Sequence, residues 1–172
     1  MRMSIFSFAS AVIFFLLIVT FSVNAEKTPG GSEIEMVIKS IVFDQNAQAP
    51  VVLLTDEKDS IVLPIWIGLC EARSIEIGIS DAVAPRPMTY DLIAAVIRTL
   101  NAKVERIVIV DMRDQVYYAQ VEVSVGGKVS KIDARPSDAI ALASRMKSPI
   151  YVKKSVLDKA ALPDPDKEKR GI

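Results

Sequence analysis

Residues 128–146 read KVSKIDARPSDAIALASRM, and they contain the transition that decides the fold. Residues 128–134 have the pattern of a strand, which predicts a strand ending at Ala134. Pro136 suits the first turn of a helix, and Asp138 places a negative charge where the helix dipole favours it. The stretch therefore predicts a strand that leads directly into a helix over residues 136–146.

The preceding segments extend this pattern. Gly126 and Gly127 predict a tight hairpin between the strand 128–134 and an earlier strand over 116–125, and a further strand is predicted over 104–110. Nearer the N-terminus, the same patterns predict three strands and then a helix: 35–43, 51–54, 60–67 and 69–80.

A single shift of 67 residues aligns the two halves of the chain. The shift pairs similar residues in successive predicted elements: Val37 with Val104, Asp44 with Asp111, Ile65 with Ile132, Ala72 with Ala139. Chance agreement among common residues is the alternative, but the shared order of three strands and a helix favours a duplicated βββα unit. Duplication would place Glu71 and Asp138 at matching helix starts.

Residues 89–100 predict an amphipathic helix between the two halves. Pro87 precedes it and Thr89 is placed to cap its first turn. Its apolar side chains recur at helical spacing and share one face: Leu92, Ile93, Val96, Ile97 and Leu100.

Composition excludes several kinds of chemistry. The chain has no histidine and one cysteine, which excludes a Ser-His-Asp site, imidazole metal ligation, an internal disulfide and a Cys-cluster zinc site. A bound metal would be a hard cation held by oxygen ligands. Lys plus Arg and Asp plus Glu number 21 each, so charge alone does not predict a nucleic-acid binder.

The N-terminus has the pattern of a secretory signal. Arg2 precedes a long apolar run, and Val23 and Ala25 stand where signal peptidase reads small or apolar residues. The predicted organisation is a signal peptide over 1–25, a linker over 26–34, one domain over 35–160 and a mobile tail over 161–172. The predicted location is the periplasm or the exterior. An uncleaved membrane anchor is the alternative, because the apolar run is almost long enough to span a bilayer.

Four motifs resemble the bifunctional nuclease domain family, and they are LPIWIG at 63–68, PRPMTYDL at 85–92, YYA at 117–119 and IDARPSDAIALA at 132–143. The resemblance covers roughly residues 35–159. It implies an α+β fold, with a mixed or antiparallel sheet and helices, and nuclease activity on both DNA and RNA. Tyr90 departs from the family pattern, because the family usually has histidine at this position.

The junction at 133–138 is the first candidate catalytic site. Asp133 and Asp138 would serve as catalytic carboxylates and as ligands of Mg²⁺ or Mn²⁺. Arg135 would bind phosphate oxygens, with Ser137 beside the free N–H groups of the helix start. The alternative is that Asp138 only satisfies its helix start and that Asp133 pairs with Arg135 to stabilise the fold.

A second candidate group comprises Glu71 and Asp91 as catalytic carboxylates, with Arg86 and Tyr90 as substrate-binding residues. Arg86 stands on a proline-rich loop, and Tyr90 is a hydrogen-bond donor but a poor base. The duplication would bring Glu71 and Asp138 together in one acidic cleft. The alternative is that Glu71 and Asp91 cap their own helices.

Other residues have simpler interpretations. Trp66 lies on the strand face opposite Leu63, Ile65 and Ile67, where burial against a helix or partner subunit is favoured over stacking on a base. Cys70 is expected to be a packed helix residue. The leading hypothesis is an exported nuclease acting on nucleic acid. The alternative is a non-catalytic, homo-oligomeric binding module in the periplasm, and either would contact a membrane only if residues 1–25 are retained.

Overall fold

The computed structural model describes residues 32–80, 82 and 84–160. These residues form seven strands and four helices in the order β1 (Glu33–Asp44), β2 (Ala49–Thr55), β3 (Val62–Trp66), α1 (Leu69–Ile79), α2 (Thr89–Thr99), β4 (Ala102–Arg113), β5 (Val116–Val125), β6 (Lys128–Ala134), α3 (Pro136–Met146), β7 (Ile150–Lys153) and α4 (Lys154–Ala160).

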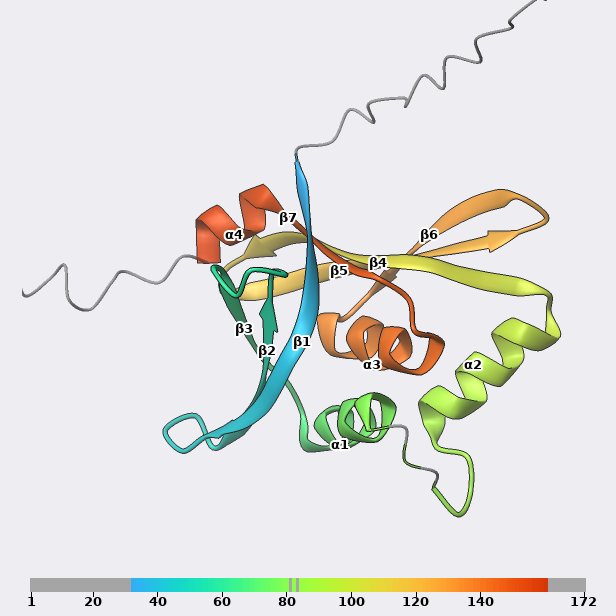
Figure 1. Cartoon of the computed structure of the whole chain (residues 1–172), viewed down its shortest axis with the longest axis horizontal. Helices are drawn as coiled ribbons and strands as arrows, with labels where there is room; N and C mark the ends of the chain where they lie inside the picture. Colours follow the sequence, from blue (N-terminus) through green and yellow to red (C-terminus); the bar gives the residue numbers. More distant parts are fainter. Residues whose placement is uncertain (1–31, 81, 83, 161–172) are drawn as a thin grey trace, which may run out of the picture.

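The strands form one sheet in the order β3-β2-β1-β7-β4-β5-β6. Every neighbouring pair is antiparallel except β4 and β7, which are parallel, so the sheet is mixed. The last strand, β7, lies in the centre and joins two three-stranded meanders (Figure 1). The predicted α+β fold is confirmed.

Helix α3 occupies the middle of the helical layer. It packs on β4 and β5 and contacts both α1 and α2, while α4 packs on β4 and β7 (Figure 1). The alanines of α3 at 139, 141 and 143 are fully or almost fully buried, because their small side chains let the helix lie close to the sheet and to α1. Ile107, Ile109 and Ile140 fill the contact between α3 and β4 with fully buried side chains.

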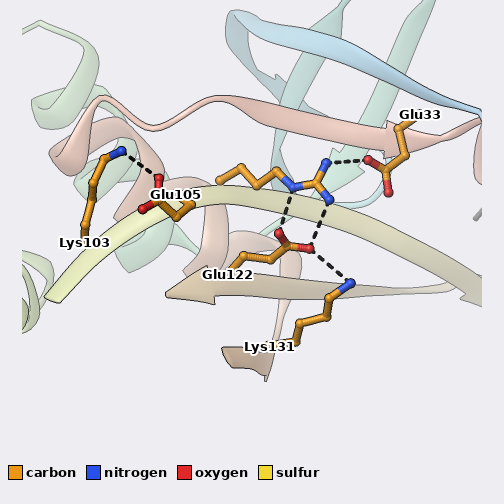
Figure 2. A network of polar contacts seen from close by, with 6 residues as sticks. Glu33, Lys103, Glu105, Glu122 and Lys131 are labelled. Carbon is orange, nitrogen blue, oxygen red and sulfur yellow. Dashed lines mark hydrogen bonds and ion pairs between the residues drawn. The ribbon is translucent and has the colours of Figure 1, made fainter. Parts of the chain in front are cut away.

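The sheet face turned away from α3 carries a charged network. Arg106 follows the bulge in β4 and precedes buried Ile107, so the pleat directs its side chain to this outer face. Its Nε donates to Glu122 Oε2 at 2.8 Å, and its guanidinium also pairs with Glu33. Figure 2 shows Glu33, Glu122 and Lys131, which link β1, β5 and β6 through this network.

The predicted element boundaries agree closely with the structure. Strands 116–125 and 128–134 and helix 136–146 begin and end where predicted, and Gly126 and Gly127 both have positive φ in their hairpin. The sequence patterns did not predict α4. A shift of 67 residues carries Leu69–Ile79 onto Pro136–Met146, and both halves have the order βββα. Common origin by duplication stays a prediction.

The predicted amphipathic helix is confirmed as α2, whose apolar face is mostly exposed and whose buried residues are Tyr90 and Ala94. Two local predictions are wrong. The N-cap of α2 is Met88 rather than Thr89. Cys70 is exposed in the first turn of α1, although Ser74 and Ile77, which follow it on the same side of the helix, are buried.

The predicted signal peptide at 1–25, residues 26–31 of the predicted linker and the tail at 161–172 lie outside the described residues. The end of the predicted linker is wrong, because Glu33 and Ile34 already belong to β1. Within the part of the chain that the structure describes, no helix is long and apolar enough to cross a membrane.

Candidate active site

Arg135 joins the starts of α1 and α3. As the N-cap residue of α3 it has extended backbone, which turns its side chain back along the first turn. Its Nε donates to Asp138 Oδ2 at 2.7 Å, and its Nη2 donates to Asp138 Oδ1 at 2.9 Å and to Glu71 Oε1 at 2.8 Å. The fork with Asp138 is bidentate and fixes the plane of the guanidinium. The Arg135 side chain remains 68% exposed, and within the described residues its Nη1 makes no hydrogen bond.

Glu71 occupies the position in α1 that Asp138 occupies in α3. Its side chain is largely buried, and its Oε2 lies against the α-carbon of Gly68, where a methyl group would overlap it. Only one Glu71 oxygen bonds Arg135, and Oε2 has no donor among the described residues. The absence of a side chain at Gly68 therefore leaves space for Glu71 Oε2, the carboxylate oxygen that does not bond Arg135.

Asp138 is held by two donors. The Tyr90 hydroxyl, reaching from α2, donates to Asp138 Oδ1 at 2.6 Å, and Arg135 holds both oxygens. Partial burial raises the pKa of Asp138, but the hydrogen bonds from Arg135 and Tyr90 and the charge of Arg135 outweigh it, so the net pKa is lowered. Burial and the hydrogen bond to Asp138 raise the pKa of Tyr90 well above its usual value, so this phenol stays protonated.

Beside Arg135 lies an open groove of about 410 Å³, which we call the junction groove. It is bordered by the β3–α1 junction, the β4–β5 turn and the β6–α3 junction. Its lining residues come from these three places: Ile65, Trp66, Ile67, Gly68, Gln115, Val116, Tyr117, Arg135, Pro136 and Ser137. Trp66 is half-exposed at its wall, and its Nε1 donates to Asp44 Oδ2 at 2.9 Å, which holds the indole in place. The expectation that Trp66 is buried is wrong for the isolated chain.

Two helix starts face this region. Neither α1 nor α3 has a side-chain hydrogen bond at its N-cap, and their first intrahelical bonds run from Ala72 N and Ala139 N. The N–H groups before these two residues have no intrahelical acceptor. Such N–H groups and the positive ends of two helix dipoles favour an anion.

Asp133 lies apart from this cluster. Its neighbours Ile132 and Ala134 line a groove together with residues of α2 and α3, so the pleat directs Asp133 to the outer face of the sheet. The structure therefore does not bring Asp133 together with Asp138 or Arg135.

Asp91 also lies elsewhere. Its Oδ2 accepts the Met88 N–H at 2.9 Å, the capping contact considered from the sequence, and its Oδ1 lies 2.8 Å from Nε of Arg145. Nε of Arg145 makes no hydrogen bond within the described residues, so Asp91 and Arg145 form an ion pair. Arg86 is exposed in the segment before α2, whereas Ser137 is buried at the start of α3 and lines the junction groove.

The side chains present do not fit a bound Mg²⁺ or Mn²⁺. Among the described residues no three Asp, Glu or Cys side chains gather where they could hold a metal. Asp133 faces away from Asp138, and both oxygens of Asp138 are already held by Arg135. We therefore assign no reaction step to a metal.

Sequence reasoning did not find the contact between Tyr90 and Asp138 or the contribution of Tyr117 to the groove. Tyr90 and Asp138 are 48 residues apart on different helices, and only the packing of α2 on α3 joins them. A duplicated pattern did signal that Glu71 and Asp138 would meet, and the structure brings them to the same guanidinium.

Comparison with known proteins places the chain. The bifunctional nuclease domain matches residues 52–165. Two proteins of Mycobacterium tuberculosis, from strains CDC 1551 / Oshkosh and ATCC 25618 / H37Rv and both described as uncharacterized, are 37% identical to it over 132 residues, which are 77% of this chain and 79% of each relative. On both grounds, the chain belongs to the bifunctional nuclease domain family.

Proposed function

We propose that this protein is a nuclease that hydrolyses phosphodiester bonds of DNA and RNA at the junction groove. One observation carries the proposal. The Arg135 guanidinium is held by Asp138 and Glu71, while the side chain as a whole stays exposed and its Nη1 makes no hydrogen bond among the described residues. A fixed guanidinium with a free edge suits a phosphate oxygen.

Arg135 would bind a non-bridging oxygen of the scissile phosphate through Nη1. Because the guanidinium is positioned before substrate arrives, it stabilises the charge that grows on the phosphate oxygens in the transition state. Ser137 and the free N–H groups at the start of α3 lie on the same side of the groove and would bind a further phosphate oxygen.

Glu71 would act as the general base. Its Oε2 would accept a proton from a water molecule, the resulting hydroxide would attack phosphorus, and the bond from phosphorus to the leaving oxygen would break. The leaving oxygen would then take a proton from solvent. Asp138 and Tyr90 would be positioning residues, because their hydrogen-bonding atoms are used in holding Arg135.

Trp66 and Tyr117 would bind the bases next to the scissile phosphate. Both line the junction groove, and the Trp66 indole is fixed through its bond to Asp44. An aromatic face stacks on an unpaired base of any sequence, so we infer a preference for single strands of either sugar type.

The test is cleavage of labelled single-stranded DNA and RNA by the full chain and its variants, in Mg²⁺, in Mn²⁺ and in EDTA. Glu71→Gln is expected to reduce the cleavage rate by about 100-fold or more, the usual contribution of a general base. Arg135→Gln is expected to cost roughly 100-fold, as for loss of one oxyanion donor.

Matched controls use the same residue types outside the site. Glu76→Gln changes an exposed glutamate of the same helix α1, and Arg113→Gln removes an exposed arginine that is also ion-paired. Both should cleave at the parent rate. If all variants share one rate, that activity is a contaminant; if the parent has none, the protein is the non-catalytic binding module.

We also propose that the protein is exported. The support is the sequence of residues 1–25, with its charged start, its apolar run and the Val23-Asn24-Ala25 site. An exported nuclease would meet nucleic acid outside the cytoplasm, and the mass of the protein recovered from cells tests the processing step.

A further inference from the structure

Two hairpins of the sheet close with the same kind of two-residue turn but use different residues. The β5–β6 turn consists of Gly126 and Gly127, with φ of 56° and 82°, and the β4–β5 turn consists of Asp114 and Gln115, with φ of 48° and 64°. Positive φ at both positions matches the twist of a hairpin, and glycine adopts it without steric cost. The glycine pair is therefore what the turn geometry by itself favours.

Gln115 is the residue that does not suit its turn. Aspartate and asparagine tolerate the left-handed backbone because their short side chains bond locally, whereas the longer side chain of glutamine has no such advantage. The Gln115 side chain is exposed and makes no hydrogen bond within the part of the chain that the structure describes. Strained residues of this kind are concentrated at binding and catalytic sites.

A second glutamine of the chain provides a comparison. The shift of 67 residues pairs Gln115 with Gln48 in the β1–β2 turn, where φ is also positive, at 52°. The side-chain amide of Gln48 donates to the Gln45 carbonyl oxygen at 2.6 Å, so this side chain stabilises its own turn. Gln115 makes no equivalent bond among the described residues. Local structure therefore explains the glutamine at position 48 but not the one at position 115.

The β4–β5 turn places Gln115 at the border of the junction groove. Gln115 and Tyr117 line the groove at this border, and Arg135 lines it at the β6–α3 junction. In the proposed function Arg135 binds a phosphate oxygen and Tyr117 stacks on a base. A carboxamide is neutral and carries both a donor and an acceptor, so it suits the edge of a base better than a phosphate.

We propose that Gln115 recognises the edge of a substrate base and gives the junction groove a preference for adenine. A carboxamide presents one donor beside one acceptor, and adenine presents the complementary pair, its 6-amino group beside N7. Stacking on Trp66 or Tyr117 accepts any base, so the edge contact selects among them. This inference rests on the proposed function, because it takes the junction groove as the place where nucleic acid binds.

The strained turn makes the role of Gln115 measurable. Glycine at this position improves the backbone conformation and removes the base contact in one change. Gln115→Gly is therefore expected to raise the melting temperature by a few degrees and to abolish the preference for adenine. A glutamine with a purely structural role would lower the melting temperature when it is replaced, and that outcome would overturn the proposal.

The experiment measures binding of labelled single-stranded DNA to the full chain in a non-ionic detergent by fluorescence anisotropy. One probe is a short run of adenine nucleotides, and the other has purine, which lacks the 6-amino group, in place of each adenine. Each protein also carries Glu71→Gln, so that hydrolysis does not consume the probe. The protein with Gln115 is expected to bind the adenine probe at least about fivefold more tightly, the lower limit for a bidentate base contact. Gln115→Gly should bind both probes equally.

The control is Gln48→Gly, which makes the same change in the β1–β2 turn. Gln48 does not line the junction groove, so this variant should keep the full preference for adenine. Equal binding of the two probes by the protein with Gln115, no binding of either, or a preference that persists in Gln115→Gly would overturn the role of Gln115. A preference that depends on Gln115 in a protein that cleaves nothing would support this inference and overturn the proposed hydrolysis alone.

Discussion

At Gly68 the backbone comes so close to the Glu71 carboxylate that a methyl group would overlap Oε2. Gly68→Ala is therefore expected to push the Glu71 side chain off Arg135 while leaving the helix in place, since the atom that must move is the end of a flexible side chain. Cleavage should fall as in Glu71→Gln, with little change in melting temperature. A variant with full activity would show that the position of Glu71 is unimportant.

Tyr90 holds Asp138 through a phenol that stays protonated. Tyr90→Phe removes this donor, so the depression of the Asp138 pKa becomes smaller. The unfolding free energy at neutral pH should fall by about 1 kcal/mol, a value kept small because Asp138 is partly exposed. Tyr118→Phe, whose hydroxyl has no hydrogen bond in the described part of the chain, should leave it unchanged. Urea denaturation measures both.

The amino-acid sequence alone predicted some of the residues at the candidate site. Arg135, Asp138 and Ser137 were predicted from their place at a strand-to-helix junction, and their backbone positions follow from local sequence. The face of the sheet on which Asp133 lies could not be predicted without knowing the strand's pleat and which face the helices cover. The ion pair between Asp91 and Arg145 could not be predicted because Arg145 lies on α3, 54 residues away in the chain.

Among the elements, α1 and α3 cross where Gly78 meets Ser144. A methyl group at Gly78 would overlap Ser144 Oγ and lie 2.8 Å from its Cβ, closer than real contacts allow. Gly78→Ala should reduce the unfolding free energy by about 1–3 kcal/mol through overpacking. Adding Ser144→Gly should restore part of this loss. Thermal denaturation of the single and double variants tests the coupling, and purely additive losses would refute it.

The network on the outer face makes stability depend on pH. The hydrogen bond from Arg106 lowers the pKa of Glu122 against the opposing effect of burial. A carboxyl with a lowered pKa in the folded state stabilises the fold above its unfolded pKa of about 4.3, and this stability is lost as pH falls through the folded pKa. Glu122→Gln should lower the melting temperature at pH 7 and flatten its decline in acid. Glu76→Gln, at an exposed position, should keep the parent profile.

Element boundaries were the most predictable level of structure. Strand β5, strand β6 and helix α3 were predicted to the residue because Gly126-Gly127 and Pro136 mark their ends. How much of the apolar face of α2 is buried could not be predicted in the same way. Its periodicity indicates an apolar face, but periodicity does not tell whether that face meets the sheet of its own chain or another surface.

For the whole molecule, the sequence predicts removal of residues 1–25. The protein recovered from the periplasm or medium should have the intact mass of a chain that begins at Glu26, because Val23 and Ala25 suit signal peptidase. The mass of the complete chain in the membrane fraction would establish the anchor instead. Mass spectrometry of both fractions from one culture distinguishes the two.

The sheet order also constrains when folding can finish. Strand β7 lies between β1 and β4, although it comes last in the chain. During synthesis the strands of both meanders leave the ribosome before β7 does. The two meanders cannot join into one sheet until residues 150–153 have also emerged. A chain stopped before Ile150 keeps two unpaired inner edges, and the seven-stranded sheet forms only when β7 is present. In the export that we propose, this late closure would keep the nascent chain unfolded while it passes through a secretion channel.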